Sequence, residues 1–61
     1  MKTKELVIMI LRQRLKPLST HEMAEILGRS WEFAYKLLNT MSKEGMVKRL
    51  DYGKGHYWAL K

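Results

Sequence analysis

Apolar residues recur at helical spacing in the first quarter of the chain. The pattern predicts a helix over about residues 3–15. Its apolar side would consist of residues three or four positions apart: Leu6, Val7, Ile10, Leu11 and Leu15. Lys16-Pro17 ends this helix, because proline disfavours the helical conformation of the residue before it. Leu18 then begins a short extended stretch.

A second helix is predicted over residues 19–27. Ser19 followed three residues later by Glu22 is a capping-box pattern, which satisfies two backbone amides at a helix start. Its apolar side would be formed by Met23, Ile26 and Leu27. Gly28 ends the helix, since glycine readily adopts the positive φ of a helix terminus.

A third helix is predicted from Ser30, an N-cap candidate, to Glu44, with Gly45 at the C-terminal cap position. Its inner side would consist of Ala34, Leu38 and Met41. The opposite side carries polar and aromatic residues: Glu32, Tyr35, Lys36, Asn39 and Lys43.

The last quarter of the chain changes from helical spacing to short β-prone runs. Residues 46–50 and 56–60 flank a loop that contains Gly53 and Gly55. Two such runs joined by a glycine-containing loop predict a β-hairpin. Trp58 and Leu60 alternate onto one face of it, and the tip is basic.

Length and composition restrict the possibilities further. The chain has 61 residues, enough for one domain with a marginal core. The absence of cysteine excludes disulfides, thiol catalysis and thiolate metal sites. Two histidines are too few for a metal site without help from carboxylates. Oligomerisation is therefore the means of stabilisation that we expect.

Charge indicates the class of partner. Twelve Lys and Arg against six Asp and Glu give a formal net charge of +6, which attracts polyanions such as nucleic acid or an anionic membrane surface. The longest apolar run, residues 6–11, is too short to span a membrane, which takes about 20 residues. It is also too short for a signal peptide. We therefore expect a cytoplasmic protein with no membrane partner.

The order of the predicted elements resembles the winged helix-turn-helix family of DNA-binding proteins. The most specific part is residues 18–28, LSTHEMAEILG, where Ala24 allows close helix approach and Gly28 makes the turn. Gly45-Met46-Val47 matches the start of the first wing strand in many members. The resemblance implies an α+β winged helix over residues 1–61 and a stand-alone transcriptional regulator that binds double-stranded DNA.

In the family's binding mode, the third helix enters the major groove and the N-terminus of the second faces a phosphate. The wing, about residues 51–56, then touches the backbone or minor groove. Lys36 suits a phosphate or guanine, Asn39 suits adenine, and Glu32 suits cytosine. The DNA contacts that the resemblance implies are Thr20, His21, Arg29, Ser30, Trp31, Glu32, Tyr35, Lys36, Asn39, Lys43, Lys54 and His56.

Structural interpretations of the same positions stay open. The lysines are also compatible with solvated surface charges, and both histidines with plain polar surface. Trp31 lies near the margin of the inner side of the third helix, where it could complete the core.

Other functions differ in what they require. The third helix carries Trp31, Phe33, Tyr35 and Leu37, so the alternative to DNA binding is a module that docks a protein through this helix. DNA binding would weaken steeply with salt, and protein docking much less. We expect no enzymatic activity, cofactor, metal ion or small-molecule substrate, because no nucleophile–base pair or phosphate-binding glycine loop is present and so short a chain has little room for a cleft.

The first helix predicts a homodimer. If Val7, Leu11 and Leu15 close the core, the apolar arc extends further, to Leu6 and Ile10, with Met9 beyond it. This arc is wider than the roughly 100° stripe that one core contact needs. We therefore expect Leu6, Met9 and Ile10 to form a dimer interface. The open alternative is that Leu6 and Met9 cover the hairpin within one subunit.

Overall fold

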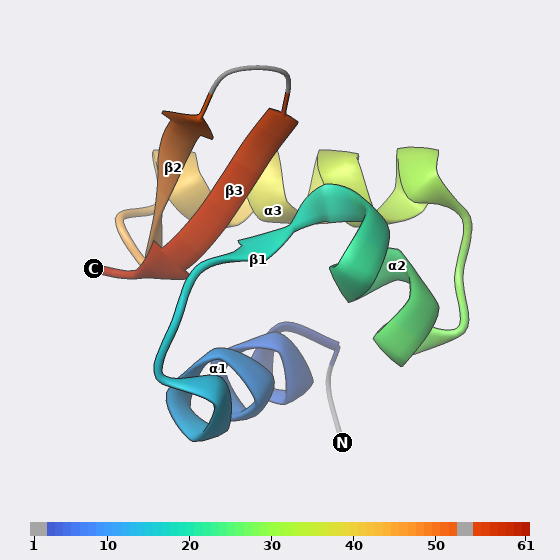
Figure 1. Cartoon of the computed structure of the whole chain (residues 1–61), viewed down its shortest axis with the longest axis horizontal. Coiled ribbons are helices and arrows are strands. Elements are labelled where there is room, and N and C mark those ends of the chain that lie inside the picture. Colours follow the sequence, from blue (N-terminus) through green and yellow to red (C-terminus); the bar gives the residue numbers. More distant parts are fainter. Residues whose placement is uncertain (1–2, 53–54) are drawn as a thin grey trace.

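The computed structural model describes residues 3–52 and 55–61. These residues form three helices and a small antiparallel sheet (Figure 1). Lys54, predicted to lie at the wing tip, falls outside the described residues. The arrangement is an α+β winged helix, as predicted. The elements in chain order are α1 (Thr3–Arg14), β1 (Leu18–Ser19), α2 (Thr20–Leu27), α3 (Trp31–Lys43), β2 (Val47–Tyr52) and β3 (Gly55–Leu60).

The helix boundaries follow from the caps that the sequence predicts. The Ser19 hydroxyl accepts a hydrogen bond from the Glu22 amide (3.1 Å), and the Glu22 carboxylate accepts one from the Ser19 amide (3.2 Å). Gly28 ends α2 in the left-handed conformation, at φ 68°. The Ser30 hydroxyl caps α3 by accepting from the Phe33 amide at 3.2 Å. The capping box and both N-caps are thus confirmed.

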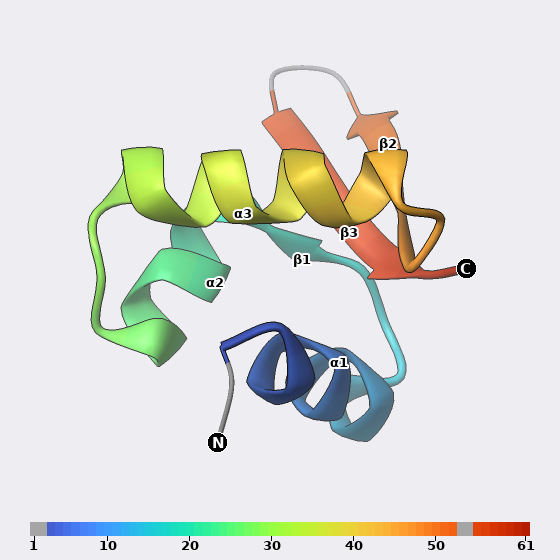
Figure 2. The same ribbon diagram turned by 180° about the vertical axis from the view of Figure 1, so that it is seen from behind.

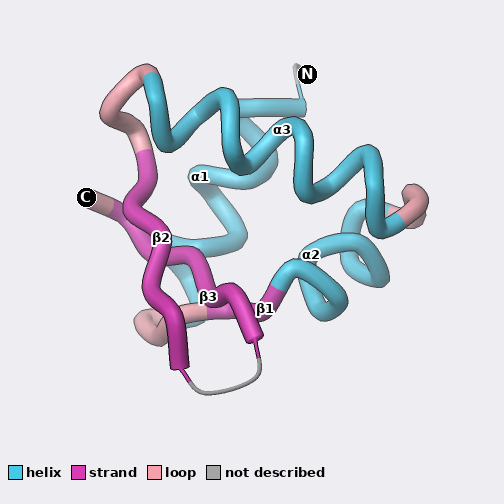
Figure 3. Tube along the Cα trace, turned by 90° about the horizontal axis from the view of Figure 1, so that it is seen from above, coloured by secondary structure: helices cyan, strands magenta, loops and turns pink. Residues whose placement is uncertain are grey.

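The sheet has the order β1-β3-β2, with both pairings antiparallel. The predicted hairpin is confirmed, with six residue pairs running from Val47↔Leu60 to Tyr52↔Gly55. In Figure 3 the strands lie together on one side of the molecule, with β3 in the middle. The short extended stretch at Leu18 pairs with β3 opposite Trp58, so it closes the sheet against the helices.

Trp58 lies at the centre of the core and is fully buried. Its indole N–H donates a hydrogen bond of 2.8 Å to the hydroxyl of Thr20, which is also buried. This bond connects the middle strand with the start of α2, and it satisfies the one polar atom that the indole brings into the core. The other large side chains that are fully buried come from every layer: Val7, Leu18, Met23, Leu38, Met41 and Val47.

The prediction for Leu15 is wrong. α1 ends at Arg14, and Leu15 takes a left-handed conformation with φ 56° and an exposure of 89%. Its amide still bonds to the Leu11 carbonyl (3.3 Å), as in a helix. The left-handed φ then turns the chain away from the helix axis, and the side chain of Leu15 lies outside the core.

The prediction for Ile10 as part of a dimer interface is also wrong. The buried side of α1 consists of Val7, Ile10 and Leu11 and does not include Leu15. Ile10 is only 8% exposed. Ile10 therefore belongs to the core of the domain. Leu6 and Met9 stay exposed, as predicted.

Replacing Leu15 by glycine is expected to stabilise the protein. A left-handed non-glycine residue costs roughly 1–2 kcal/mol, and glycine removes this strain but gains freedom in the unfolded chain. We therefore expect the free energy of unfolding to rise by about 0.5–1 kcal/mol, measured by urea denaturation. Leu15→Ala is the control, since it keeps the Cβ atom; an equal gain in both variants would contradict the explanation by strain.

Candidate nucleic-acid interface

One side of α3 is free of packing and carries the polar stripe. Glu32, Lys36, Asn39 and Lys43 recur at helical spacing, opposite the fully buried Ala34, Leu38 and Met41. Glu32 and both lysines are exposed, and Asn39 is half-buried. Figure 2 shows α3 at the front of the molecule, with its first turns beside α2 and its second half in front of β3 and β2. This stripe, which we call the α3 stripe, can therefore reach a ligand without rearrangement of the core.

Aromatic rings join the first turns of α3 to the wing. Trp31 stacks on Tyr35 with ring centroids 5.1 Å apart and an interplanar angle of 6°. Tyr35 meets Trp58 edge-on at 6.1 Å and His56 at 6.0 Å. Tyr35 was expected to project outward, but it is half-buried and its ring packs between Trp31 and the residues of the hairpin. Trp31 is 47% exposed and forms the outer layer of this stack.

The wing brings basic residues to the same side as α3. Arg49 pairs with Trp58 and Asp51 with His56, and opposite residues of antiparallel strands share a face of the sheet. Trp58 and His56 contact Tyr35 on α3, so their face of the sheet is the one toward α3. Arg49 and Asp51 therefore also lie on the face toward α3. Arg49 was not predicted as a contact. The alternation of residues along its strand, which places it on the face of Trp58, is the signal that could have identified it.

Asp51 organises the polar groups of the wing. Its carboxylate lies 2.8 Å from Nδ1 of His56 and 3.6 Å from Nε of Arg49. The hydrogen bond with His56 holds the pKa of Asp51 below its ordinary value of 3.8, and the charge of Arg49 acts in the same direction. The carboxylate is therefore ionised at neutral pH, where it orients His56 and offsets part of the positive charge of Arg49.

The predicted residues of α2 have different positions. Thr20 is predicted to face a phosphate through the free amides at the start of α2; its side chain is buried and bonded to Trp58, so such a contact would use its backbone. His21 is exposed and pairs with Glu25 at 2.7 Å. His21 does meet other predicted residues, since it lines a shallow pocket of about 180 Å³ with Trp31 and His56.

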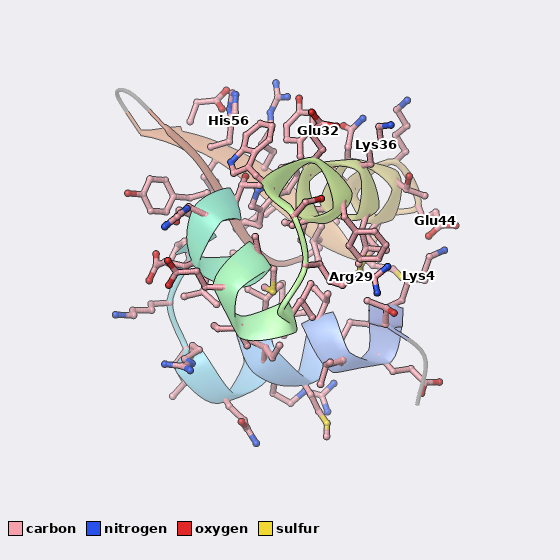
Figure 4. The ribbon with its side chains drawn as sticks, turned by 90° about the vertical axis from the view of Figure 1, so that its right-hand side faces the viewer. Lys4, Arg29, Glu32, Lys36, Glu44 and His56 are labelled. Carbon is pink, nitrogen blue, oxygen red and sulfur yellow. The ribbon has the colours of Figure 1, made fainter. Side chains whose placement is uncertain are left out.

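Arg29 does not join the α3 stripe. Its guanidinium lies over the ring of Phe33, 4.2 Å from the centroid. Figure 4 shows Glu32, Lys36 and His56 along one edge of the molecule, and Arg29 on the other flank of α3, toward α1. On that flank the ion pair of Lys4 with Glu44 (2.9 Å) ties α1 to the end of α3. The candidate interface therefore consists of the α3 stripe, Ser30, Trp31, His21, Arg49 and His56.

Residues 3–52 and 55–61 lack two further features that could suggest a function. No cluster of three or more His, Asp or Glu side chains there could hold a metal ion. None of the helices described is long and apolar enough to cross a membrane.

Comparison with known proteins gives one match. Searches of the curated proteins and of the solved structures found no significant similarity. The model of the family described as FaeA-like protein matches residues 3–61, which is nearly the whole chain and includes all six elements. The chain therefore belongs to the FaeA-like proteins, a family with a winged-helix-like fold, and membership indicates a DNA-binding regulator at the level of the family.

Proposed function

We propose that this protein is a transcriptional regulator that places α3 in the major groove and its wing on the adjacent backbone. The observation that carries the proposal is the unpacked α3 stripe, flanked by the basic side of the wing. A helix of 13 residues is about 20 Å long, and the major groove admits one such helix. The net charge of +6 favours approach to a polyanion.

The side chains of the interface suit different parts of DNA. Lys36, Lys43 and Arg49 are exposed cations on one side of the molecule, which suits phosphate contacts. Asn39 lies between the two lysines and can bond bidentately to adenine. Glu32, at the start of the stripe, accepts from the amino group of cytosine and repels phosphate, so it restricts how deeply the first turn enters.

Salt dependence of DNA binding tests the proposal. Each phosphate contact contributes a slope of about −0.9 in log K against log salt, which is roughly a 3.5-fold loss of affinity between 50 and 200 mM. Three contacts through Lys36, Lys43 and Arg49 predict a loss of about 40-fold for a labelled duplex, measured by fluorescence anisotropy. Affinity that does not change with salt, or no binding to duplex DNA, would contradict the proposal.

The alternative, docking of a protein through the aromatic residues of α3, has less support from the geometry. Leu37 packs against the core, Phe33 lies under Arg29, and Tyr35 is covered by Trp31. Only Trp31 of these four side chains remains exposed. One exposed tryptophan is also what a DNA contact beside the wing would require.

Self-association is the second part of the proposal. With Ile10 in the core, a homodimer would join through Leu6 and Met9 on the outer side of α1. Sedimentation equilibrium at about 100 μM is expected to give a dimer that Met9→Glu converts to a monomer. Met46→Glu is the matched control, because Met9 and Met46 have similar exposures of 42% and 40% and Met46 lies after α3. A monomeric parent protein would exclude the dimer.

A further inference from the structure

A groove lies between the end of α1 and the outer face of the hairpin. Its volume is about 450 Å³, and its apolar floor consists of Leu11, Pro17, Leu50, Ala59 and Leu60. Lys48, Leu50 and Ala59 line this groove, and they are one residue away along their strands from Arg49 and Trp58. Because successive side chains of a strand point to opposite faces, the groove opens away from α3. A ligand bound there would leave the α3 stripe uncovered.

The rim of the groove is basic on both walls. Arg12 and Lys16 belong to α1 and the loop after it, whereas Lys48 belongs to β2. The described residues that line the groove include no acidic residue. Within the described part of the chain, none of these three cations takes part in an ion pair. The rim therefore offers uncompensated positive charge around an apolar floor.

Leu15 adds a second, independent observation. It also lines the groove, yet it is 89% exposed and held at φ 56°, a conformation that leucine rarely adopts. Nothing in the packing of the subunit requires an exposed leucine in a strained turn. Backbone strain of this kind is a reason to look for a function of the segment.

We propose that this groove docks an acidic segment of a partner polypeptide. The apolar side chains of that segment would lie on the floor of the groove and against Leu15, and its carboxylates would contact the cations of the rim. Charge complementarity decides the occupant. A second copy of this chain carries a net charge of +6 and would bring like charge to the rim. A fatty acid is a poorer match, because it has one anionic head group and the cations lie on two opposite walls of the groove. The inference does not depend on DNA binding, since it concerns the other side of the sheet.

Selection from random peptides tests the proposal. Phage-displayed peptides of about twelve residues would be enriched on the full chain, and the enriched sequences synthesised and titrated into ¹⁵N-labelled protein. We expect sequences that combine Asp or Glu with Leu-like residues, and amide shifts confined to the groove: residues 11–17, 48–50 and 59–60. Arg12→Glu and Lys48→Glu are each expected to weaken binding about tenfold through repulsion at the rim.

Arg14→Glu is the matched control, because Arg14 is exposed on the same helix but does not line the groove. It changes the net charge as much as Arg12→Glu does and is expected to leave the affinity within about twofold. Leu15→Gly separates binding from folding, since it should weaken the peptide while stabilising the fold. The proposal is overturned if no acidic–apolar sequence is enriched, if the shifts fall on α3, or if Arg12→Glu and Arg14→Glu behave alike. It is also overturned if decanoate, but no peptide, binds in the groove.

Discussion

Replacing Trp58 by alanine is expected to unfold the protein. Removal of a fully buried aromatic side chain costs about 3–5 kcal/mol, and the core of so small a domain rarely supplies more than about 3–5 kcal/mol in total. The variant should therefore lack a cooperative thermal transition in circular dichroism. The indole of Trp58 bonds to Thr20 of α2 and meets Tyr35 of α3, which is why its loss would affect the sheet and both helices together.

Smaller changes at the same site separate packing from hydrogen bonding. Trp58→Phe keeps an aromatic ring but leaves the buried Thr20 hydroxyl without its donor, and Thr20→Val leaves the indole N–H without its acceptor. Each unpaired group costs about 1–3 kcal/mol. The double variant is expected to lose less than the sum of the two single losses, because neither polar atom is then left alone.

Trp31 is the matched control, since it is the other tryptophan of the chain and is half-exposed. Trp31→Ala loses the stacking on Tyr35 and should cost only about 0.5–1.5 kcal/mol in urea denaturation. Equal destabilisation by Trp31→Ala and Trp58→Ala would contradict the position of the core described above.

Removing both lysines of the α3 stripe is expected to have the largest effect on DNA binding. Lys36→Ala combined with Lys43→Ala should flatten the slope of log K against log salt by about 2, because each lysine neutralises one phosphate. Affinity at low salt should fall for all sequences alike. Asn39→Ala should instead cost about 1–3 kcal/mol at one base position and leave the slope unchanged.

Lys16→Ala combined with Lys48→Ala is the control for net charge. These lysines are exposed and line the groove on the face away from α3. We expect little change in the slope of DNA binding. A control variant that flattens the slope as much as the α3 variant would show that overall charge, and not the α3 stripe, sets the affinity.

Local sequence signals predicted most of the fold. Ser19 with Glu22, Gly28 and Ser30 determine where α2 and α3 begin and end through bonds within a few residues, so spacing alone identifies them. The hairpin is equally local, since its strands are separated by a short glycine-containing loop.

The end of the first helix was predicted wrongly, because it depends on backbone geometry that the spacing of apolar residues does not reveal. Leu15 continues the spacing of Val7 and Leu11, yet the chain turns left-handed there before Lys16-Pro17. Leu15 is exposed at this turn, whereas Ile10 belongs to the core. A residue's position on a helical wheel is informative only as far as the helix extends.

The candidate site was predicted where it depends on one helix and missed where it depends on tertiary contacts. The α3 stripe follows from helical spacing. The burial of Thr20 requires Trp58, 38 residues away, and the place of Arg29 follows from its contact with Phe33. Arg49 joins the candidate interface only because β2 pairs with β3 in the observed register.

Titration of unlabelled duplex DNA into ¹⁵N-labelled protein tests the central claim most directly, since it maps the bound surface residue by residue. The largest amide shifts are expected along the α3 stripe, from Glu32 to Lys43, and at Arg49 and His56 in the wing. The outer side of α1 and the groove around Leu50 should change little. Shifts that centre on the groove or on α1, with α3 unaffected, would contradict the assignment of α3 as the DNA-reading helix.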